Sequence, residues 1–171
     1  MLMFLKNKQS MIGNDIIDLD LARKESNWKR KGFLEKIFSL EEQAMIHGDP
    51  NPELVVWNLW SRKEAAYKIY NRHTGIRGYF PWLLQCSYDN QNLGKVVIED
   101  FVFYTQTEIT HDYIYSVAVS DTDFFDKIKP LETAEDIKKD NGIPYILDAF
   151  TNSIQPVSKT HHGRFQKIIS L

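Results

Sequence analysis

The spacing of apolar residues along the chain predicts one dominant helix. It begins at Asn51, a residue type that often caps helices, has Pro52 at its first helical position, and continues without a breaker to about Tyr70. Apolar side chains, Trp57 and Trp60 among them, fill so many of its positions that a surface location is excluded. The pattern therefore predicts a long helix at the centre of the molecule.

Shorter helical patterns lie on both sides of this stretch. Residues 19–32 are helical in places and rich in charge. Ser39 with Glu42 three residues later is typical of a capping box, in which each side chain satisfies the free amide of the other residue. A further short helix is predicted over residues 133–139, closed by the pair Asn141-Gly142.

Alternating patterns in the second half of the chain predict strands. They cover residues 95–104 and 113–120, and two more strands are expected at residues 143–147 and 165–171. Because helices come first and strands follow, the sequence indicates an α+β fold with an antiparallel sheet packed against the long central helix.

Length and composition favour one domain. With 171 residues, 43% of them hydrophobic, the chain can bury one core, and we expect a single domain over residues 11–171 after a loose extension over residues 1–10. The 21 basic and 23 acidic side chains nearly cancel, which gives no reason to expect nucleic acid or a membrane as partner. Cys86 is the only cysteine and is interpreted as part of the core. The short apolar run at the N-terminus makes a cytoplasmic location the default expectation.

Two segments place charged residues among apolar neighbours. Asp15 follows Gly13 in an apolar stretch, where a carboxylate must be solvated, placed at a helix N-cap or bound to a cation, and this pattern alone favours the cap. Glu64 and Lys68 lie four residues apart in the long helix, in the order that favours an ordinary ion pair. Their position in the most apolar helix of the chain argues against a pair kept only for surface solvation.

A polar cluster precedes the last predicted strand. Residues 157–164 bring hydroxyls, imidazoles and a guanidinium together beside Gly163, a combination that suits phosphate oxygens. Taken alone, the cluster fits an exposed turn better than a binding site. His47, His73 and His111 have no partners recognisable in the sequence and are interpreted as surface or structural residues.

In their order along the chain, these segments resemble the motifs of the 4′-phosphopantetheinyl transferase superfamily. Smaller matches at residues 33–42, 74–76 and 142–145 extend the resemblance from Ile12 to the C-terminus. The order resembles the single-module holo-acyl-carrier-protein synthases, whereas residues 96–119 are closer to the longer surfactin-type enzymes. The three main segments are Gly13-Asn14-Asp15, Trp60 to Lys68, and Ser158-Lys159-Thr160-His161 followed by Gly163-Arg164.

The resemblance implies a magnesium-dependent transfer of the phosphopantetheine arm of coenzyme A to a serine of a carrier protein. It implies that Asp15 and Glu64 hold Mg²⁺, an ion that usually takes one or two carboxylates and completes its shell with water and phosphate oxygens. Glu64 is expected to accept the proton of the serine, and Lys68 to stabilise charge on the leaving adenosine 3′,5′-bisphosphate. The residues expected to hold phosphates or the adenosine end are Lys63 and His161, with Thr74 and Gly75 nearby.

An acyl or peptidyl carrier protein is the partner that the resemblance implies. The stretch from Arg23 to Lys36 contains six basic residues and two acidic ones, so we expect an acidic carrier protein to dock there, with a solvated helix face as the alternative. One set of motifs per chain favours a homo-oligomer, and the single-module relatives favour a trimer. Whether the carrier protein serves fatty-acid, polyketide or peptide synthesis stays open.

Four positions depart from the pattern of the family. Leu59 and Ile143 stand where basic residues are usual, Lys159 stands at an apolar position, and Ile17 replaces a second metal-binding acid of the longer enzymes. These changes bear on the affinity for coenzyme A more than on the type of reaction. Two alternatives are a catalytically silent relative that binds carrier protein or coenzyme A without transfer, and an unrelated α+β domain in which the helix pair is merely structural.

Overall fold

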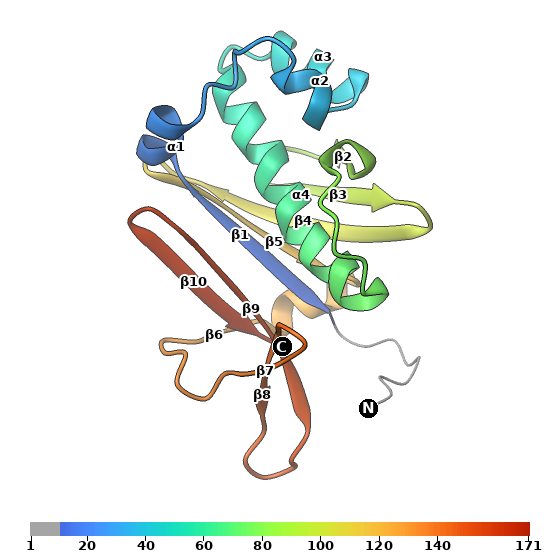
Figure 1. Ribbon diagram of the computed structural model, residues 1–171, viewed down its shortest axis with the longest axis vertical. Helices are drawn as coiled ribbons and strands as arrows, with labels where there is room; N and C mark the ends of the chain where they lie inside the picture. Colours follow the sequence, from blue (N-terminus) through green and yellow to red (C-terminus); the bar gives the residue numbers. More distant parts are fainter. Residues whose placement is uncertain (1–10) are drawn as a thin grey trace.

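The computed structural model describes residues 11–171, and its spine is the long helix α4 (Pro52–Thr74) (Figure 1). The side chain of Asn51 accepts a hydrogen bond from the Leu54 amide at 3.3 Å, and Gly75 ends the helix in the left-handed conformation with φ of 74°. The predicted central helix is confirmed and continues beyond Tyr70 until this glycine. No helix within residues 11–171 is long and apolar enough to span a membrane. The predicted extension over residues 1–10 lies outside the described residues.

The first sheet packs against α4 and is antiparallel throughout. The strand predicted over residues 113–120 is confirmed. The single strand predicted over residues 95–104 is wrong: two strands meet at a turn in which Glu99 has a positive φ of 50°. The order across the sheet is β1 (Ile12–Asp18), β5 (Tyr113–Val119), β4 (Phe101–Ile109), β3 (Leu93–Ile98) and β2 (Gln85–Tyr88).

A second antiparallel sheet is built from the end of the chain. The strands expected at residues 143–147 and 165–171 are confirmed, but the helix expected over residues 133–139 is absent. Asn141 and Gly142 both have positive φ, so they form a hairpin turn instead of closing a helix. The order is β6 (Lys129–Pro130), β10 (Phe165–Ser170), β9 (Ile154–His162), β8 (Ile143–Leu147) and β7 (Lys138–Asp140).

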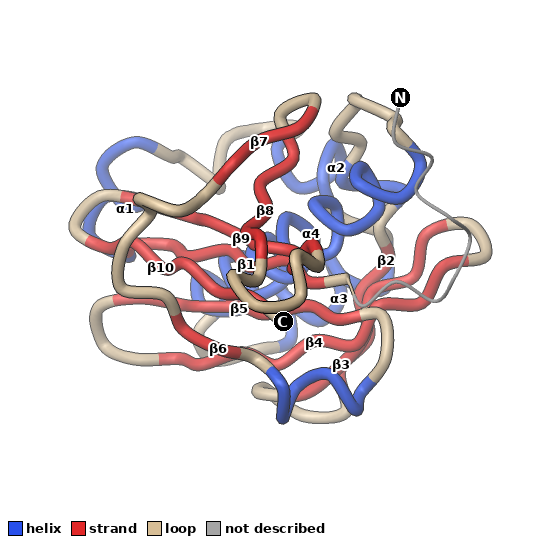
Figure 2. Tube along the Cα trace, turned by 90° about the horizontal axis from the view of Figure 1, so that it is seen from below, coloured by secondary structure: helices blue, strands red, loops and turns tan. Residues whose placement is uncertain are grey.

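Strand β1 joins the two sheets, because β9 lies along its free edge (Figure 2). Alternate side chains of a strand point to the same side. Three such side chains of β9 accept hydrogen bonds from the backbone amides of β1, in place of the backbone carbonyl groups that usually join two strands. Most of the polar stretch at 157–164 therefore belongs to a strand, in which Ser158 and Thr160 are buried, and only Gly163 and Arg164 form an exposed turn. The three bonds run from the Asn14 amide to Ser158 Oγ (3.0 Å), from the Ile16 amide to Thr160 Oγ1 (3.2 Å) and from the Asp18 amide to His162 Nδ1 (2.9 Å).

Short helices cover one end of α4 (Figure 1). The predicted capping box is confirmed, with Ser39 and Glu42 bonding to each other's amides. The interpretation of Asp15 as a helix cap is wrong, because Asp15 lies in β1 and Asp18 caps the following helix. These elements are α1 (Leu19–Glu25), α2 (Phe33–Ile37) and α3 (Leu40–Gly48), while single 3-10 turns form η1 (Pro81–Leu83) and η2 (Thr122–Lys127).

Candidate active site

The site begins where β1 crosses α4, and the close approach depends on Gly13. A Cβ atom at this position would collide with the carbonyl oxygen of Ala65 on α4. Because side chains alternate along a strand, Asp15 lies on the same face of β1 as the missing side chain of Gly13. The glycine therefore allows β1 to bring the Asp15 carboxylate against the helix.

Asp15 is a largely buried acid, with its side chain 15% exposed. Thr160 Oγ1 donates a hydrogen bond to Asp15 Oδ1 at 3.2 Å, and Lys68 Nζ lies 3.8 Å from the same oxygen. Burial raises the pKa of Asp15 to about 7, the positive charge of Lys68 opposes the rise, and the negative charge of Glu64 adds to it. The positive charge of Lys68 is therefore not enough to offset the effect of burial on the Asp15 carboxylate.

Glu64 lies on α4 one turn before Lys68. Burial raises the pKa of Glu64, while the charge of Lys68 and the nearby Tyr79 hydroxyl oppose that rise. The charge of Glu64 also raises the pKa of Asp15, so the two carboxylates are close enough to repel each other. Two partly desolvated carboxylates in one space favour a shared proton or a bound cation.

Lys68 connects the helix to both neighbouring strands. Its ammonium donates to the carbonyl oxygen of Asn14 on β1 at 2.6 Å and to that of Lys159 on β9 at 3.4 Å. Burial lowers the pKa of Lys68, and the charges of Asp15 and Glu64 oppose that decrease. A simple surface pair along one helix would not require these contacts across the fold.

A cavity of about 470 Å³ opens beside Lys68 and is lined by α4, β9 and the β7–β8 hairpin. None of the described residues that line it is acidic. The excess of positive charge favours an anionic ligand. Its cationic side chains are Lys68, Arg72, Lys139 and Lys159, and the predicted residue His161 joins them in the lining.

Arg72 is a site residue that the sequence reading missed. It lies one turn beyond Lys68 on α4, and its guanidinium donates to the carbonyl oxygens of Val157 at 2.7 Å and Ile12 at 3.3 Å. Burial lowers the pKa of Arg72 to about 10, which leaves it cationic at neutral pH. Its spacing of four residues from Lys68 was the signal that could have identified it.

Lys63 lies inside the protein and does not line the cavity beside Lys68. The side chain is completely buried, and its ammonium donates to Glu42 Oε2 at 2.7 Å and to the carbonyl oxygens of Ile37 at 3.0 Å and Pro81 at 2.8 Å. All three ammonium hydrogens are therefore used inside the protein. The prediction that Lys63 holds phosphates or the adenosine end of coenzyme A therefore receives no support from this geometry.

Thr74 and Gly75 do not line the cavity beside Lys68. The Thr74 hydroxyl donates to the Tyr70 carbonyl oxygen at 2.8 Å and accepts from the Ile76 amide at 3.2 Å. Gly75 provides the left-handed cap of α4. Both residues therefore shape the end of the helix, and their predicted contact with coenzyme A receives no support from this geometry.

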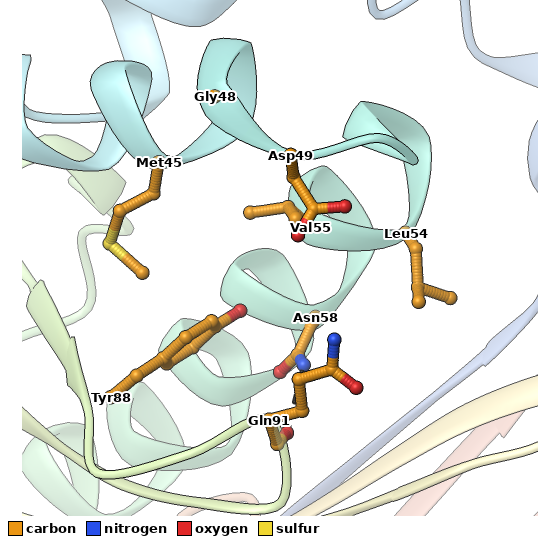
Figure 3. Close-up of a pocket in the computed structure, with 8 residues that line it drawn as sticks. All are labelled: Met45, Gly48, Asp49, Leu54, Val55, Asn58, Tyr88 and Gln91. Atoms are coloured by element: carbon orange, nitrogen blue, oxygen red, sulfur yellow. Dashed lines mark hydrogen bonds between the residues drawn. The ribbon is translucent and has the colours of Figure 1, made fainter.

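A second cavity, of about 360 Å³, lies between α3, α4 and the turn that joins β2 to β3 (Figure 3). Met45 and Val55 contribute apolar walls, and Asn58, Tyr88 and Gln91 contribute polar groups. None of the residues predicted for the site lines this cavity. It is thus chemically and spatially separate from the paired carboxylates.

The metal implied by the resemblance fits the donor set formed by Asp15 and Glu64. Residues 11–171 contain no group of three or more His, Cys, Asp or Glu side chains that could hold a metal ion by themselves. Magnesium does not require one, since it commonly keeps several waters and takes further oxygens from substrate phosphates. Burial raises the pKa of both acids, and a divalent cation bound between them would stabilise their ionised forms.

Comparison with known proteins identifies the class to which this fold and site correspond. The family model of the 4′-phosphopantetheinyl transferase superfamily matches residues 11–121. The chain therefore belongs to the 4′-phosphopantetheinyl transferase superfamily. The predictions of this family and of an enzyme of the phosphopantetheinyl transferase class are confirmed.

The similar curated relatives are holo-[acyl-carrier-protein] synthases. The one from Caldanaerobacter subterraneus subsp. tengcongensis is 28% identical over 120 residues, which cover 64% of this chain and 92% of the relative. The one from Campylobacter jejuni subsp. jejuni is 30% identical over 115 residues, which cover 63% of this chain and 95% of the relative. The predicted likeness to the holo-acyl-carrier-protein synthase type is confirmed.

The fold of this chain is also similar to that of a solved structure. An apo-ACPS structure from Chronobacterium ammoiniagenes matches with a TM-score of 0.52 and 13% identity, covering 64% of this chain and 94% of that one. The predicted α+β fold is confirmed by this match and by the packing of the sheet against α4. The family model ends before β6, so the roles of β9 residues rest on their contacts in this structure.

Proposed function

We propose that this protein transfers the 4′-phosphopantetheine group of coenzyme A to a serine of an acyl or peptidyl carrier protein and releases adenosine 3′,5′-bisphosphate. The observation that carries the proposal is that Lys68, one turn after Glu64 on α4, lies 3.8 Å from Asp15 Oδ1 and lines a cationic cavity, so that acids from distant parts of the chain lie near one ammonium. Membership of the superfamily supports this class of reaction.

The cavity suits the anionic part of coenzyme A. Lys68 is placed nearest the acids, whereas Arg72, Lys139 and Lys159 extend the positive charge along the lining. Ile143, which stands where the family has a lysine, lines the same cavity as Lys159. Lys159 therefore supplies a cation to a region where the expected one is missing. His161 adds a further donor for phosphate oxygens.

Asp15 and Glu64 are the residues that would hold Mg²⁺. When bound, the ion supplies charge neutralisation for the pyrophosphate of the donor and polarises the phosphorus. Thr160 fixes the Asp15 carboxylate by its hydrogen bond to Oδ1, and Gly13 allows β1 to approach the helix. The chain thus contributes two oriented acids, while water and the donor complete the oxygen shell.

The reaction is a displacement at phosphorus. The serine oxygen of the carrier protein forms a bond to the phosphorus of phosphopantetheine, and the bond from this phosphorus to the leaving bisphosphate oxygen breaks. Glu64 accepts the proton of the serine hydroxyl, directly or through a water molecule. Lys68 stabilises the negative charge that develops on the leaving group.

The basic stretch from Arg23 to Lys36 supports docking of an acidic carrier protein. All six of its basic side chains are exposed, and they lie on α1, α2 and the segment between them. A homo-oligomer, with a trimer favoured, stays a prediction, and so does a cytoplasmic location.

The decisive experiment is mass spectrometry of an apo acyl carrier protein incubated with coenzyme A, Mg²⁺ and this protein. We expect the carrier protein to gain the mass of one phosphopantetheine group. Glu64→Gln should slow transfer by about 10²-fold or more, because the proton acceptor and a metal ligand are lost. Glu53→Gln is the control on the same helix, and both variants are compared at saturating carrier protein because Glu53 bonds to Arg23 of the basic stretch at 3.1 Å.

Each other outcome identifies an alternative. If the wild-type protein binds coenzyme A but gives no mass gain with acyl or peptidyl carrier proteins, it is a catalytically silent relative. If transfer occurs at equal rates with Glu64→Gln and Glu53→Gln, Glu64 is a structural residue and the proposed assignment of its role is incorrect.

A further inference from the structure

The segment between α4 and β2, residues 76–84, exposes large apolar side chains. We call it the aromatic loop. Phe80 is 52% exposed, Trp82 is 54% exposed and Leu83 is 40% exposed, whereas Leu84 at its end is buried. Isolated exposed apolar residues are common, but several within one short loop indicate a surface that contacts another molecule.

The aromatic loop is held in place by the buried cation described above. Lys63 donates to the carbonyl oxygen of Pro81, between the two exposed rings, and its ion pair with Glu42 has no exposed surface. Tyr79 turns inward, with its ring centroid 5.0 Å from that of Tyr67. A buried ion pair is costly to desolvate, so it contributes little stability by itself but restrains the loop that it contacts. Phe80 and Trp82 are therefore presented to solvent by an ordered backbone.

The aromatic loop adjoins the basic stretch. The same Lys63 ammonium contacts the carbonyl oxygen of Ile37, the last residue of α2, so α2 and η1 lie side by side (Figure 1). Lys36 precedes Ile37 and is exposed, and Leu40, which begins α3, is 81% exposed. The surface thus combines apolar side chains with adjacent cations.

The aromatic loop also borders the candidate active site. Tyr79 precedes Phe80 directly, and its ring lies 5.0 Å from that of Tyr67, which follows Glu64 by three residues and so lies on the same side of α4. On the other side, the Tyr79 ring lies 5.9 Å from that of Trp60, which stacks with Phe33 of α2 at 6.4 Å. The aromatic loop therefore lies next to the part of α4 that carries Glu64.

We propose that Phe80, Trp82, Leu83 and Leu40 form the apolar half of the surface that binds the carrier protein. The partner chemistry is an acidic protein with an apolar strip beside the serine that receives phosphopantetheine. Its acids face Lys36 and the neighbouring cations, and its apolar strip packs on the aromatic loop. This inference rests on the proposed function and adds a second, salt-insensitive component to the predicted basic docking stretch.

The test compares the double variant Phe80→Ser/Trp82→Ser with Phe150→Ser. Phe150 is a matched control because it is 99% exposed but lies in the turn between β8 and β9. For the double variant we expect the KM for apo acyl carrier protein to rise about tenfold or more, as for loss of aromatic contacts at an interface. The KM for coenzyme A and the kcat at saturating carrier protein should stay unchanged, as should all values for Phe150→Ser.

The outcomes separate this inference from the proposed function. An unchanged KM for carrier protein in the double variant, with an active wild type, overturns the aromatic loop as a docking surface and leaves the transfer reaction intact. If the wild type transfers nothing, calorimetric titration with apo acyl carrier protein still decides. Binding that weakens in the double variant but not in Phe150→Ser supports the surface, and equal binding in all three proteins overturns it.

Discussion

Two adjacent cations on α4, Arg62 and Lys63, are both fully buried but point in different directions from the helix. Arg62 donates to Asn58 Oδ1 at 2.7 Å and to Thr105 Oγ1 at 2.9 Å, toward β4. Lys63 pairs with Glu42 of α3. Burial of a charge is tolerated here because every ammonium hydrogen of Lys63 has an acceptor.

At this residue scale, Lys63→Met should be strongly destabilising. The substitution leaves the Glu42 carboxylate buried without a cation, which typically costs about 3–5 kcal/mol. Lys63→Met/Glu42→Gln should recover part of the loss, because glutamine is neutral and keeps an oxygen for the Cys86 amide. Urea unfolding of the three proteins measures the difference, and equal stability of the single and double variants would show that the charge of Glu42 is not the cause.

The different positions of Lys63 and Glu64 have a simple geometric reason. Consecutive residues of an α-helix are separated by about 100° of rotation, so Lys63 and Glu64 cannot both face the site. The pattern identified Glu64 and Lys68, which share a face, and the same rule would have added Arg72 and removed Lys63. What surrounds each face is set by α2, α3 and the aromatic loop, and their positions depend on tertiary packing.

At the scale of elements, Asp18 connects the start of α1 to the turn between β9 and β10. Its carboxylate accepts from the amides of Asp20 and Leu21 as the helix cap. The guanidinium of Arg164 donates to Asp18 Oδ2 at 2.9 Å and to Oδ1 at 2.8 Å. Hydrogen bonds from Arg164 hold the pKa of Asp18 well below its usual range.

This lowered pKa predicts a specific loss of stability in acid. The ionised form of Asp18 is favoured by folding, so its contribution is fully present above the unfolded-state pKa of about 3.9 and is lost as the pH falls below that value. Asp18→Asn keeps a capping side chain but should lower the free energy of unfolding at pH 7 by about 1.5–3 kcal/mol. The difference from wild type should shrink as unfolding is measured at successively lower pH. A difference that is constant from pH 7 to pH 3 would contradict the assignment.

The elements differ in how far local patterns could predict them. The capping box at Ser39 and the proline start of α4 act through neighbouring residues, and both were correct. Asn141-Gly142 was misread because a positive φ occurs at helix ends and in hairpins alike, and only the pairing partner distinguishes the two.

At the scale of the whole molecule, β1 holds the two sheets together by different means. On one edge it pairs with the backbone of β5, and on the other its amides donate to side chains of β9. Ser158 and Thr160 have equivalent bonds to β1, but Thr160 alone of these two also donates to Asp15. The junction between the sheets therefore positions one of the two candidate metal ligands.

This arrangement predicts different effects for two similar substitutions. Ser158→Ala and Thr160→Val should each lower the free energy of unfolding by about 1–3 kcal/mol, because each leaves a β1 amide without its acceptor. Thr160→Val should in addition reduce Mg²⁺ affinity and the rate of transfer about tenfold or more, as when a residue that orients a ligand is removed. Calorimetry with Mg²⁺ alone and the transfer assay give both values. Equal losses in the two variants would contradict a role for Thr160 in orienting Asp15.

The sequence by itself determined the central helix, the α+β class and, through the resemblance of its motifs, the family. These features depend on residue identity and on spacing along one element, which the chain carries locally. Only the tertiary structure decided that Lys63 is buried, that Arg72 joins the cavity and that Thr160 contacts Asp15. The burial of Lys63 depends on how α2, α3 and the aromatic loop pack on α4, and the other two facts depend on how β1, α4 and β9 meet. Contacts between separate elements have no local pattern that encodes them.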